Sequence, residues 1–311
     1  APQEWMAEQA LVHFEKTAQW EEPASLPETA ELNDFLCQAP SETSVTAQKG
    51  KGGPEAMACS LSASYFKPYL AHASIGLCCA LARFDGQHLQ VWTHSQGIQN
   101  LRDDIVLALR HSPTPLDKAQ ITIEHVEGAG CYGHNGADDV AFDAVLLALS
   151  QPHTTVRVLW TREQELANAP LGAAQRVDLR ATLNAQGHIE QWHHELWANG
   201  YSSRPGRAST SVLLAAPDLP WGQAAPIAIN PPLAAGGGAE RNAIPIYDIE
   251  HQQIISHRLL TMPLRTSALR ALGGYANVFA IESFMDELAH ACDSDPMEFR
   301  LRHLSDARAI E

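Results

Sequence analysis

The sequence predicts an α+β (mixed α/β) fold, in which mixed sheets carry packed helices, and three observations support this class. Short alternating or continuously apolar stretches, typical of strands, lie between stretches with apolar residues every three or four positions, typical of helices. Strand–helix–strand units therefore recur along the chain. Turn signals such as Asp85-Gly86 separate other neighbouring strands, which indicates antiparallel hairpins.

At the N-terminus, residues 4–16 place Leu11 and Phe14 on one face of a predicted amphipathic helix. Residues 21–56 are polar and rich in Pro, Ser and Gly, which predicts a connector with one short helix. A compact body is expected to begin near residue 57.

The body then predicts strands and helices in alternation. Apolar strand patterns cover 57–84, 89–95, 119–128 and 155–166, the last running into a turn. Helical patterns cover 98–112 and 136–151, and a hairpin spans 176–200 around "NAQG". Residues 217–245 hold six Pro and four Gly and predict a long irregular loop. Residues 282–304 predict two helices separated at Asp295-Pro296.

Composition excludes several functions. A formal net charge of −15 argues against sequence-independent binding to nucleic acid or to anionic lipid. No apolar run reaches the roughly 18 residues of a membrane span, and no signal peptide is visible. The six cysteines have no zinc-type or iron–sulfur spacing and are expected to be mainly buried thiols. The adjacent His193 and His194 are expected to be solvated or packed, not to bind metal.

The stretch "GAGCYGHNGADD", residues 128–139, follows a predicted strand and leads into a helix. Asn135 is a candidate N-cap for that helix, with Asp138 and Asp139 in its first turn. A glycine turn before a helix can bind an anion through exposed N–H groups. The Lys of a P-loop is absent, although residues 128–133 match the dinucleotide pattern GxGxxG. A nucleotide site, a tight turn without ligand and a site for another anionic cofactor all remain open on this motif.

Three segments together resemble the molybdenum-binding (large) subunit of the xanthine dehydrogenase and aldehyde oxidase family, in particular its isoquinoline 1-oxidoreductase and nicotinate dehydrogenase branch. They are "VWTHSQGIQNLRDDIVLAL" (91–109), "VEGAGCYGHNGADDVAFDAVLLA" (126–148) and "PLRTSALRALGGYANVFAIESFMDELAHACDSDPMEFRLRHL" (263–304). The resemblance implies a molybdopterin-binding domain over 55–311, and a tail of a preceding small domain plus connector over 1–54. The cofactor implied is molybdenum with a pterin, in bacteria usually a cytosine dinucleotide.

The resemblance also implies roles for particular residues. Gln96 is expected beside the ligand sphere of the metal, and Tyr132 and Gly133 are expected against the pterin and metal, with Gly130 and Cys131 in the same turn. Arg270 is expected to line the site, with Gly273 and Gly274 approaching the cofactor. No protein residue is expected to ligate the metal directly. Side chains are absent from the turn, on this interpretation, so that backbone N–H groups can reach a polyanionic cofactor without a lysine.

The family hydroxylates N-heteroaromatic or aldehyde substrates with oxygen from water and passes electrons to iron–sulfur clusters on a small 2Fe-2S subunit. A cytochrome c type acceptor is a further candidate partner. The catalytic glutamate of the family lies in a Gly-Glu motif beyond the third segment, and no such motif occurs before Glu311. We therefore expect a fragment without a catalytic residue of its own, inactive and without cofactor in isolation. Cytoplasm and periplasm both remain open. The alternative is a non-catalytic α/β module that binds a nucleotide or a partner.

Several residues have simpler interpretations. His134 is expected to contact solvent, and the 236–238 glycines are expected to be disordered. Cys131 lacks the His and Asn/Asp arrangement of a cysteine nucleophile. Glu282 and Asp286 share a helix face and resemble a paired-carboxylate site, but such acids are usually solvated.

Overall fold

The computed structural model describes residues 3–21, 25–50 and 61–311, and it confirms the mixed class. The strands are β1 (Ser41–Lys49), β2 (Leu61–Lys67), β3 (Cys79–Phe84), β4 (Leu89–Thr93), β5 (Ile121–His125), β6 (Thr155–Leu159), β7 (Gln175–Leu183), β8 (Ile189–Ala198) and β9 (His251–Leu259). The α-helices are α1 (Glu4–Thr17), α2 (Leu32–Gln38), α3 (Ile98–Leu109), α4 (Ala137–Ser150), α5 (Arg162–Asn168), α6 (Gly274–Ala291), α7 (Pro296–Arg302) and α8 (Ala307–Ile310), and single 3-10 turns lie at Thr29–Glu31, Lys118–Gln120 and Leu233–Ala235.

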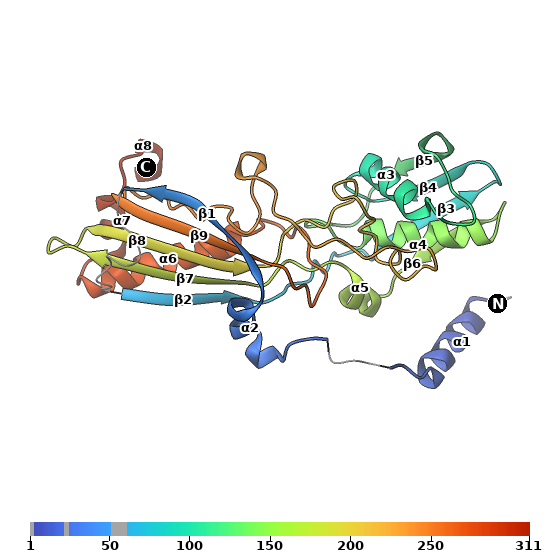
Figure 1. Ribbon diagram of the computed structural model, residues 1–311, viewed down its shortest axis with the longest axis horizontal. Coiled ribbons are helices and arrows are strands. Elements are labelled where there is room, and N and C mark those ends of the chain that lie inside the picture. The colour runs from blue at the N-terminus through green and yellow to red at the C-terminus, as the bar shows by residue number, and fades with distance from the viewer. Residues whose placement is uncertain (1–2, 22–24, 51–60) are drawn as a thin grey trace.

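Two mixed sheets form two lobes, with loops running between them (Figure 1). The larger lobe has the strand order β1-β9-β8-β7-β2, and the smaller lobe has the order β5-β4-β3-β6. Each sheet contains one parallel pair, β8 with β9 and β4 with β5, while the other neighbours are antiparallel. The parallel pairs require long connections, and the glycine turn lies directly after β5, where the chain leaves the smaller sheet for α4.

In the larger lobe, α6 packs on β7 and β2, with the rings of Trp192 and Phe284 in edge-to-face contact at 5.4 Å. Both side chains are fully buried. The predicted β7–β8 hairpin is confirmed, since Asn184 accepts hydrogen bonds from the N–H groups of Gln186 and His188 in the turn. This sheet provides a rigid support for the segment that leads into α6.

In the smaller lobe, α4 packs on β3, β6 and β4. Its first nine residues are buried except Asp143, so the helix is enclosed on nearly all sides at its N-terminal end. A helix of this kind belongs inside a domain and not on its surface. The helices predicted over 98–112 and 136–151 are confirmed as α3 and α4, and the hairpin at Asp85-Gly86 is confirmed as well. The glycine turn therefore leads into one of the best-buried elements of the chain.

Four elements differ from the sequence prediction. The stretch predicted as a connector contains strand β1, which forms the edge of the larger sheet against β9, and β9 itself was not predicted. Residues 162–168, predicted as a turn, form α5 because Thr161 and Gln164 make a reciprocal capping box. Helix α6 begins at Gly274, earlier than its apolar pattern indicated.

The remaining predictions are mostly confirmed. The N-terminal helix, the short helix in the connector and the α6–α7 break are present, and 217–245 is irregular apart from one 3-10 turn. The predicted strand residues 57–60 lie outside the described part of the chain. The cysteine prediction is wrong for most of the described thiols, because only Cys78 is buried and Cys37, Cys79, Cys131 and Cys292 are half-buried. Within the described ranges, no helix is long and apolar enough to cross a bilayer.

Candidate functional site

The glycine turn is held between the two lobes by backbone hydrogen bonds to the third sequence segment. The N–H of His134 donates to the carbonyl of Ala268 at 2.7 Å, and the N–H of Arg270 donates to the carbonyl of Tyr132 at 2.8 Å. These bonds form a short antiparallel bridge between Gly133 and Leu269. Two segments that the sequence singled out separately, around Tyr132 and around Arg270, therefore meet directly.

Two of the turn glycines are required by backbone geometry. Gly133 has φ of +136°, and a Cβ there would lie 2.0 Å from the carbonyl oxygen of Ala268. Gly130 has φ of +86°, a conformation that side chains disfavour. Tyr132 lies between them with φ of +57°, in the left-handed region that a non-glycine residue rarely occupies. Strain of this kind is concentrated at functional sites in proteins.

The turn leaves consecutive backbone donors without a partner. Among the described residues, the N–H groups of Cys131, Tyr132 and Gly133 donate to no acceptor. Three successive N–H groups in a turn with left-handed residues form a concave donor set that suits an anion or an oxygen ligand. This donor set fits a group that is rich in oxygen and negative charge.

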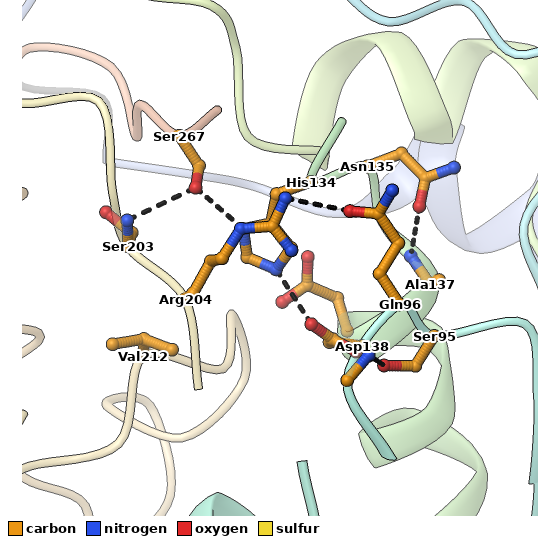
Figure 2. A network of polar contacts seen from close by, with 12 residues as sticks. Ser95, Gln96, His134, Asn135, Ala137, Asp138, Ser203, Arg204, Val212 and Ser267 are labelled. Atoms are coloured by element: carbon orange, nitrogen blue, oxygen red, sulfur yellow. Dashed lines mark hydrogen bonds and ion pairs between the residues drawn. The ribbon is translucent and has the colours of Figure 1, made fainter. Parts of the chain in front are cut away.

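Gln96 lies beside this turn, at the end of the β4 region. Its Nε2 donates to the Cys131 sulfur at 2.8 Å, and its Oε1 accepts from Nη2 of Arg204 at 2.8 Å. Figure 2 shows Arg204 reaching Gln96 from the loop on the opposite side. The structure thus brings Gln96 and Cys131 together, while their contact with a cofactor stays a prediction. No histidine bonds to the Cys131 sulfur within the described ranges, so a cysteine nucleophile gains no support.

Arg204 is a site residue that sequence analysis missed. It lies in a loop of Ser, Gly and Pro, and no local pattern marks it. Burial lowers the pKa of Arg204, while the charge of Asp138 acts in the opposite direction. An arginine remains protonated under these conditions. The loop therefore contributes a fixed positive charge next to Gln96.

The support beneath the turn is a buried polar chain centred on His134 (Figure 2). Its Nε2 is 2.8 Å from Oδ2 of Asp138, and its Nδ1 is 2.8 Å from Oγ of Ser267, which also accepts the N–H of Ser203 at 3.2 Å. His134 is only 5% exposed, so the prediction that it contacts solvent is wrong. Burial alone would raise the pKa of Asp138, but the hydrogen bond and charge of His134 outweigh burial and lower the pKa.

The start of α4 is fixed by side chains from both lobes. The prediction of Asn135 as the N-cap is wrong by one residue, because Gly136 occupies the N-cap position. The Asn135 side chain still accepts the N–H of Ala137, the first residue of the helix, at 3.1 Å. Asp139 makes two bonds to Arg265, at 2.8 and 2.6 Å, and is 2% exposed. This ion pair joins the N-terminal end of α4 to the third segment.

The third sequence segment, which pairs with the glycine turn, also contains Arg270, Gly273 and Gly274. The Arg270 side chain is exposed, has no ion-pair partner among the described residues and lines a hollow of about 350 Å³. The N–H of Gly273 donates to the carbonyl of Gly238 at 3.1 Å, and a Cβ on Gly273 would lie 2.1 Å from the carbonyl oxygen of Ala239. Packing against this loop explains the glycine at 273. That Arg270, Gly273 and Gly274 contact a cofactor stays a prediction.

The structure also shows the surroundings of the 236–238 loop, of Glu282 with Asp286, and of the adjacent histidines 193 and 194. Gly237 and Gly238 are buried, and the carbonyl of Gly238 accepts the N–H of Gly273 before α6, so the prediction of disorder for this loop is wrong. Glu282 and Asp286 both bind Arg300, at 2.9 and 2.6 Å, and form a structural ion-pair network. His193 and His194 are both buried and packed, and no cluster of metal-ligating side chains occurs in the part of the chain that the structure describes.

A strained turn with unbonded N–H groups lies between two mixed lobes, and its donors fit an anionic group. The family model of the molybdopterin cofactor-binding domain matches residues 38–218 and 234–304. The chain belongs to this family and to the molybdenum-binding subunits of xanthine oxidase type enzymes.

Curated relatives extend this assignment. The chain is 40% identical over 253 residues to a nicotinate dehydrogenase subunit from Pseudomonas putida strain KT2440, and the match covers 81% of this chain and 19% of the relative. It is 25% identical over 247 residues to the aldehyde oxidoreductase molybdenum-binding subunit PaoC of Escherichia coli K12, covering 78% of this chain and 28% of that protein. The chain thus spans roughly a fifth to three tenths of the length of these relatives.

Solved structures share the fold. Quinoline 2-oxidoreductase from Pseudomonas putida 86 superposes with a TM-score of 0.63 at 17% identity, over 93% of this chain and 34% of that chain. Aldehyde oxidoreductase from Desulfovibrio gigas superposes with a TM-score of 0.58 at 16% identity, over 86% of this chain and 26% of that chain. At these identities the comparison establishes the architecture.

Proposed function

We propose that this chain forms the part of a molybdenum hydroxylase that holds the pterin and metal end of the cofactor, and that the complete enzyme oxidises an N-heteroaromatic or aldehyde substrate. The observation that carries the proposal is the meeting of Gln96, the 130–133 turn and the segment at Arg270. When bound, the cofactor supplies a two-electron oxidation in which water provides the oxygen and the substrate loses one C–H bond.

The chain's own residues would bind and orient the cofactor. The unbonded N–H groups of residues 131–133 would donate to oxygen atoms on it, as backbone donors do in other anion sites. Gln96 retains one amide N–H that the Cys131 sulfur does not take, and Arg204 fixes the orientation of the amide. The hydrogen bond between His134 and Asp138 would fix the turn to the first turn of α4. We assign no general base to this chain and propose that the catalytic glutamate belongs to another part of the enzyme.

The proposal includes the rest of the assembly. Electrons would leave through iron–sulfur clusters on a small 2Fe-2S subunit and then through a cytochrome c type acceptor, and the cofactor would carry a cytosine dinucleotide. The relative at 40% identity is, according to its name, one subunit of a dehydrogenase, which supports a partner chain. A periplasmic and a cytoplasmic enzyme are both compatible with this proposal.

A dinucleotide-binding module is less consistent with the geometry. In a dinucleotide site the third glycine lies at the start of the helix, where the pyrophosphate meets the helix N-terminus. Here Gly133 precedes Ala137, the first residue of α4, and pairs with Leu269. Gly133 therefore pairs with another segment of the chain, at a position where a dinucleotide site needs it at the helix N-terminus.

The test uses the full-length subunit co-expressed with its small partner in a host supplied with molybdate. Near-stoichiometric molybdenum and pterin dinucleotide are expected in the wild type. Gln96→Ala should lower turnover by about 10²-fold, the usual effect of removing one aligned donor. Gln99→Ala, at an exposed position on α3, is the matched control and should leave turnover unchanged. A folded, partner-bound wild type without molybdenum would contradict the proposal.

A further inference from the structure

The segment of residues 72–76 lies along the glycine turn and is bonded to the chain on both sides of it. The N–H of Gly76 donates to the carbonyl of Ala129 at 2.8 Å, just before residue 130. The side-chain amide of Asn135, just after the turn, donates to Oγ of Ser74 at 3.1 Å. Ser74 is 1% exposed, so this second bond lies in the interior. The segment therefore supports the turn from a third part of the sequence.

His72 contacts the centre of this arrangement through the carbonyl of Ala268. Its Nε2 is 3.0 Å from that oxygen, and the N–H of His134 donates to the same oxygen at 2.7 Å. Because a carbonyl oxygen has two lone pairs, these two donors fill it. A Cβ on Gly133 would lie 3.0 Å from Nε2 of His72, so the ring also closes against the turn. His72 thus binds the carbonyl to which the end of the turn is bonded.

The imidazole of His72 is buried and neutral, with its single N–H available for this bond. The residue is 6% exposed. Burial lowers the pKa of His72, and the charges of His134 and Arg204 act in the same direction. These effects outweigh the hydrogen bonds to carbonyl groups, which act in the opposite direction. Since a carbonyl oxygen can only accept, Nε2 carries the proton of the neutral ring.

The backbone between His72 and Ser74 is strained. Ala73 has φ of +46°, in the left-handed region that residues other than glycine rarely occupy. Ala73 is exposed, whereas both of its neighbours are buried. A strained conformation persists when the surrounding contacts outweigh its cost. The bonds of His72 and Ser74 supply such contacts here.

We propose that His72 is a positioning residue of the glycine turn, which acts by holding the Ala268 carbonyl where the N–H of His134 reaches it. Without His72, this carbonyl keeps one donor among the described residues, and the strained turn loses part of its support. The unbonded N–H groups of residues 131–133 would then be less well fixed for a ligand, because preorganised donors depend on the side chains that hold them. The inference rests on the proposed function for its effect on the cofactor, whereas its effect on the backbone does not.

The experiment measures amide hydrogen exchange by mass spectrometry in the full-length subunit with its partner. The amides followed are those of His134 and Arg270, whose bonds hold the turn. His72→Leu removes the donor and should speed the exchange of both amides at least about 5-fold, as expected for the loss of one hydrogen bond. His72→Gln keeps an N–H donor and should exchange within about 2-fold of the wild type.

His303→Leu is the matched control. His303 is 2% exposed, and its Nδ1 is 2.7 Å from the carbonyl oxygen of Phe299 in the core of the larger lobe. Its replacement should leave the exchange of the His134 and Arg270 amides unchanged. Urea denaturation of each variant establishes that it folds.

Molybdenum content is the second readout, because a merely structural histidine would not affect it in a folded protein. His72→Leu should contain less molybdenum than the wild type, and His72→Gln should contain as much. Equal exchange in the wild type and His72→Leu would overturn the proposal, as would equal exchange in His72→Leu and His72→Gln. Faster exchange in His72→Leu with the molybdenum content of the wild type would overturn it as well. A wild type without molybdenum would contradict the proposed function, and the exchange comparison would still decide the role of His72 in the turn.

Discussion

The bond between Arg265 and Asp139 offers the sharpest test of how the site is assembled. Arg265 donates to both oxygens of Asp139 and also to the carbonyls of Val212 and Asn168. One guanidinium therefore links α4, the 212–214 loop, the end of α5 and the third segment. The perturbation is Arg265→Met, which keeps most of the side-chain length and removes every one of these donors.

The expected cost follows from the burial of the carboxylate. The Asp139 side chain is 1% exposed, and among the described residues it keeps one donor after the substitution, the N–H of Leu214 at 2.9 Å. Removing one partner of a buried ion pair costs about 3–5 kcal/mol, because the remaining charge stays desolvated. The two carbonyls each lose a bond worth about 1 kcal/mol, although water replaces part of it. We expect a loss of about 5 kcal/mol in the free energy of unfolding.

The assay is urea denaturation followed by tryptophan fluorescence, with Asp139→Asn and the double variant completing a double-mutant cycle. The double variant should be more stable than Arg265→Met alone by at least about 2 kcal/mol, because it no longer contains an unpaired buried charge. Lys118→Met, at an exposed ion pair, should change stability by less than about 1 kcal/mol. A cost below about 1 kcal/mol for Arg265→Met, or strict additivity in the cycle, would refute this reasoning.

Three further predictions concern neighbouring parts of the site. Gly133→Ala should lower the free energy of unfolding by about 3 kcal/mol, because the new Cβ would lie 2.0 Å from a carbonyl oxygen and φ is +136°. Gly236→Ala is the control, since φ is +98° there but no atom lies within 4 Å of the new Cβ. It should lower the free energy of unfolding by about half as much in the same urea assay. Burial raises the pKa of Asp104 from 3.8 to about 6, a shift that corresponds to about 3 kcal/mol. The wild type should therefore lose stability relative to Asp104→Asn as the pH rises from 4 to 7. A stability difference between the two proteins that does not change with pH would contradict this prediction. His134→Ala should lower the free energy of unfolding by about 3–5 kcal/mol, because the buried Asp138 carboxylate loses its partner. A change below about 1 kcal/mol in thermal or urea unfolding would show that the His134–Asp138 pair does not support the turn.

Local signals account for the parts of the fold that the sequence predicted correctly. The β7–β8 hairpin depends on a turn of Asn and Gly, and α4 depends on helical spacing and acidic residues in its first turn. By contrast, β1 pairs with β9 across most of the length of the chain, from Ser41 opposite Leu259. Most side chains of β1 are partly or fully exposed, so no apolar pattern marks it as a strand. Long-range pairing of this kind leaves no trace in a short window of sequence.

The same distinction applies to the site. Gln96, Tyr132 and Arg270 were predicted through a resemblance of whole segments, and the structure brings these segments together. Arg204 could not be predicted, because its role depends on where a loop lies relative to Gln96. His134 had one readable signal, the acid four residues later at Asp138. Its second partner, Ser267, lies 133 positions along the chain, where no local pattern could indicate it.

The clamp on the glycine turn also sets an order of events during synthesis. His134 and Ser267 are separated by 133 positions, so the turn leaves the ribosome well before the segment that gives it its shape. At about 5–20 residues per second, translation of that interval takes roughly 7–27 s. Throughout this time α4 can fold locally, whereas the strained backbone at Tyr132 lacks the bond from Arg270. Any ligand that recognises the finished turn can therefore be received only after the chain has been made beyond Arg270.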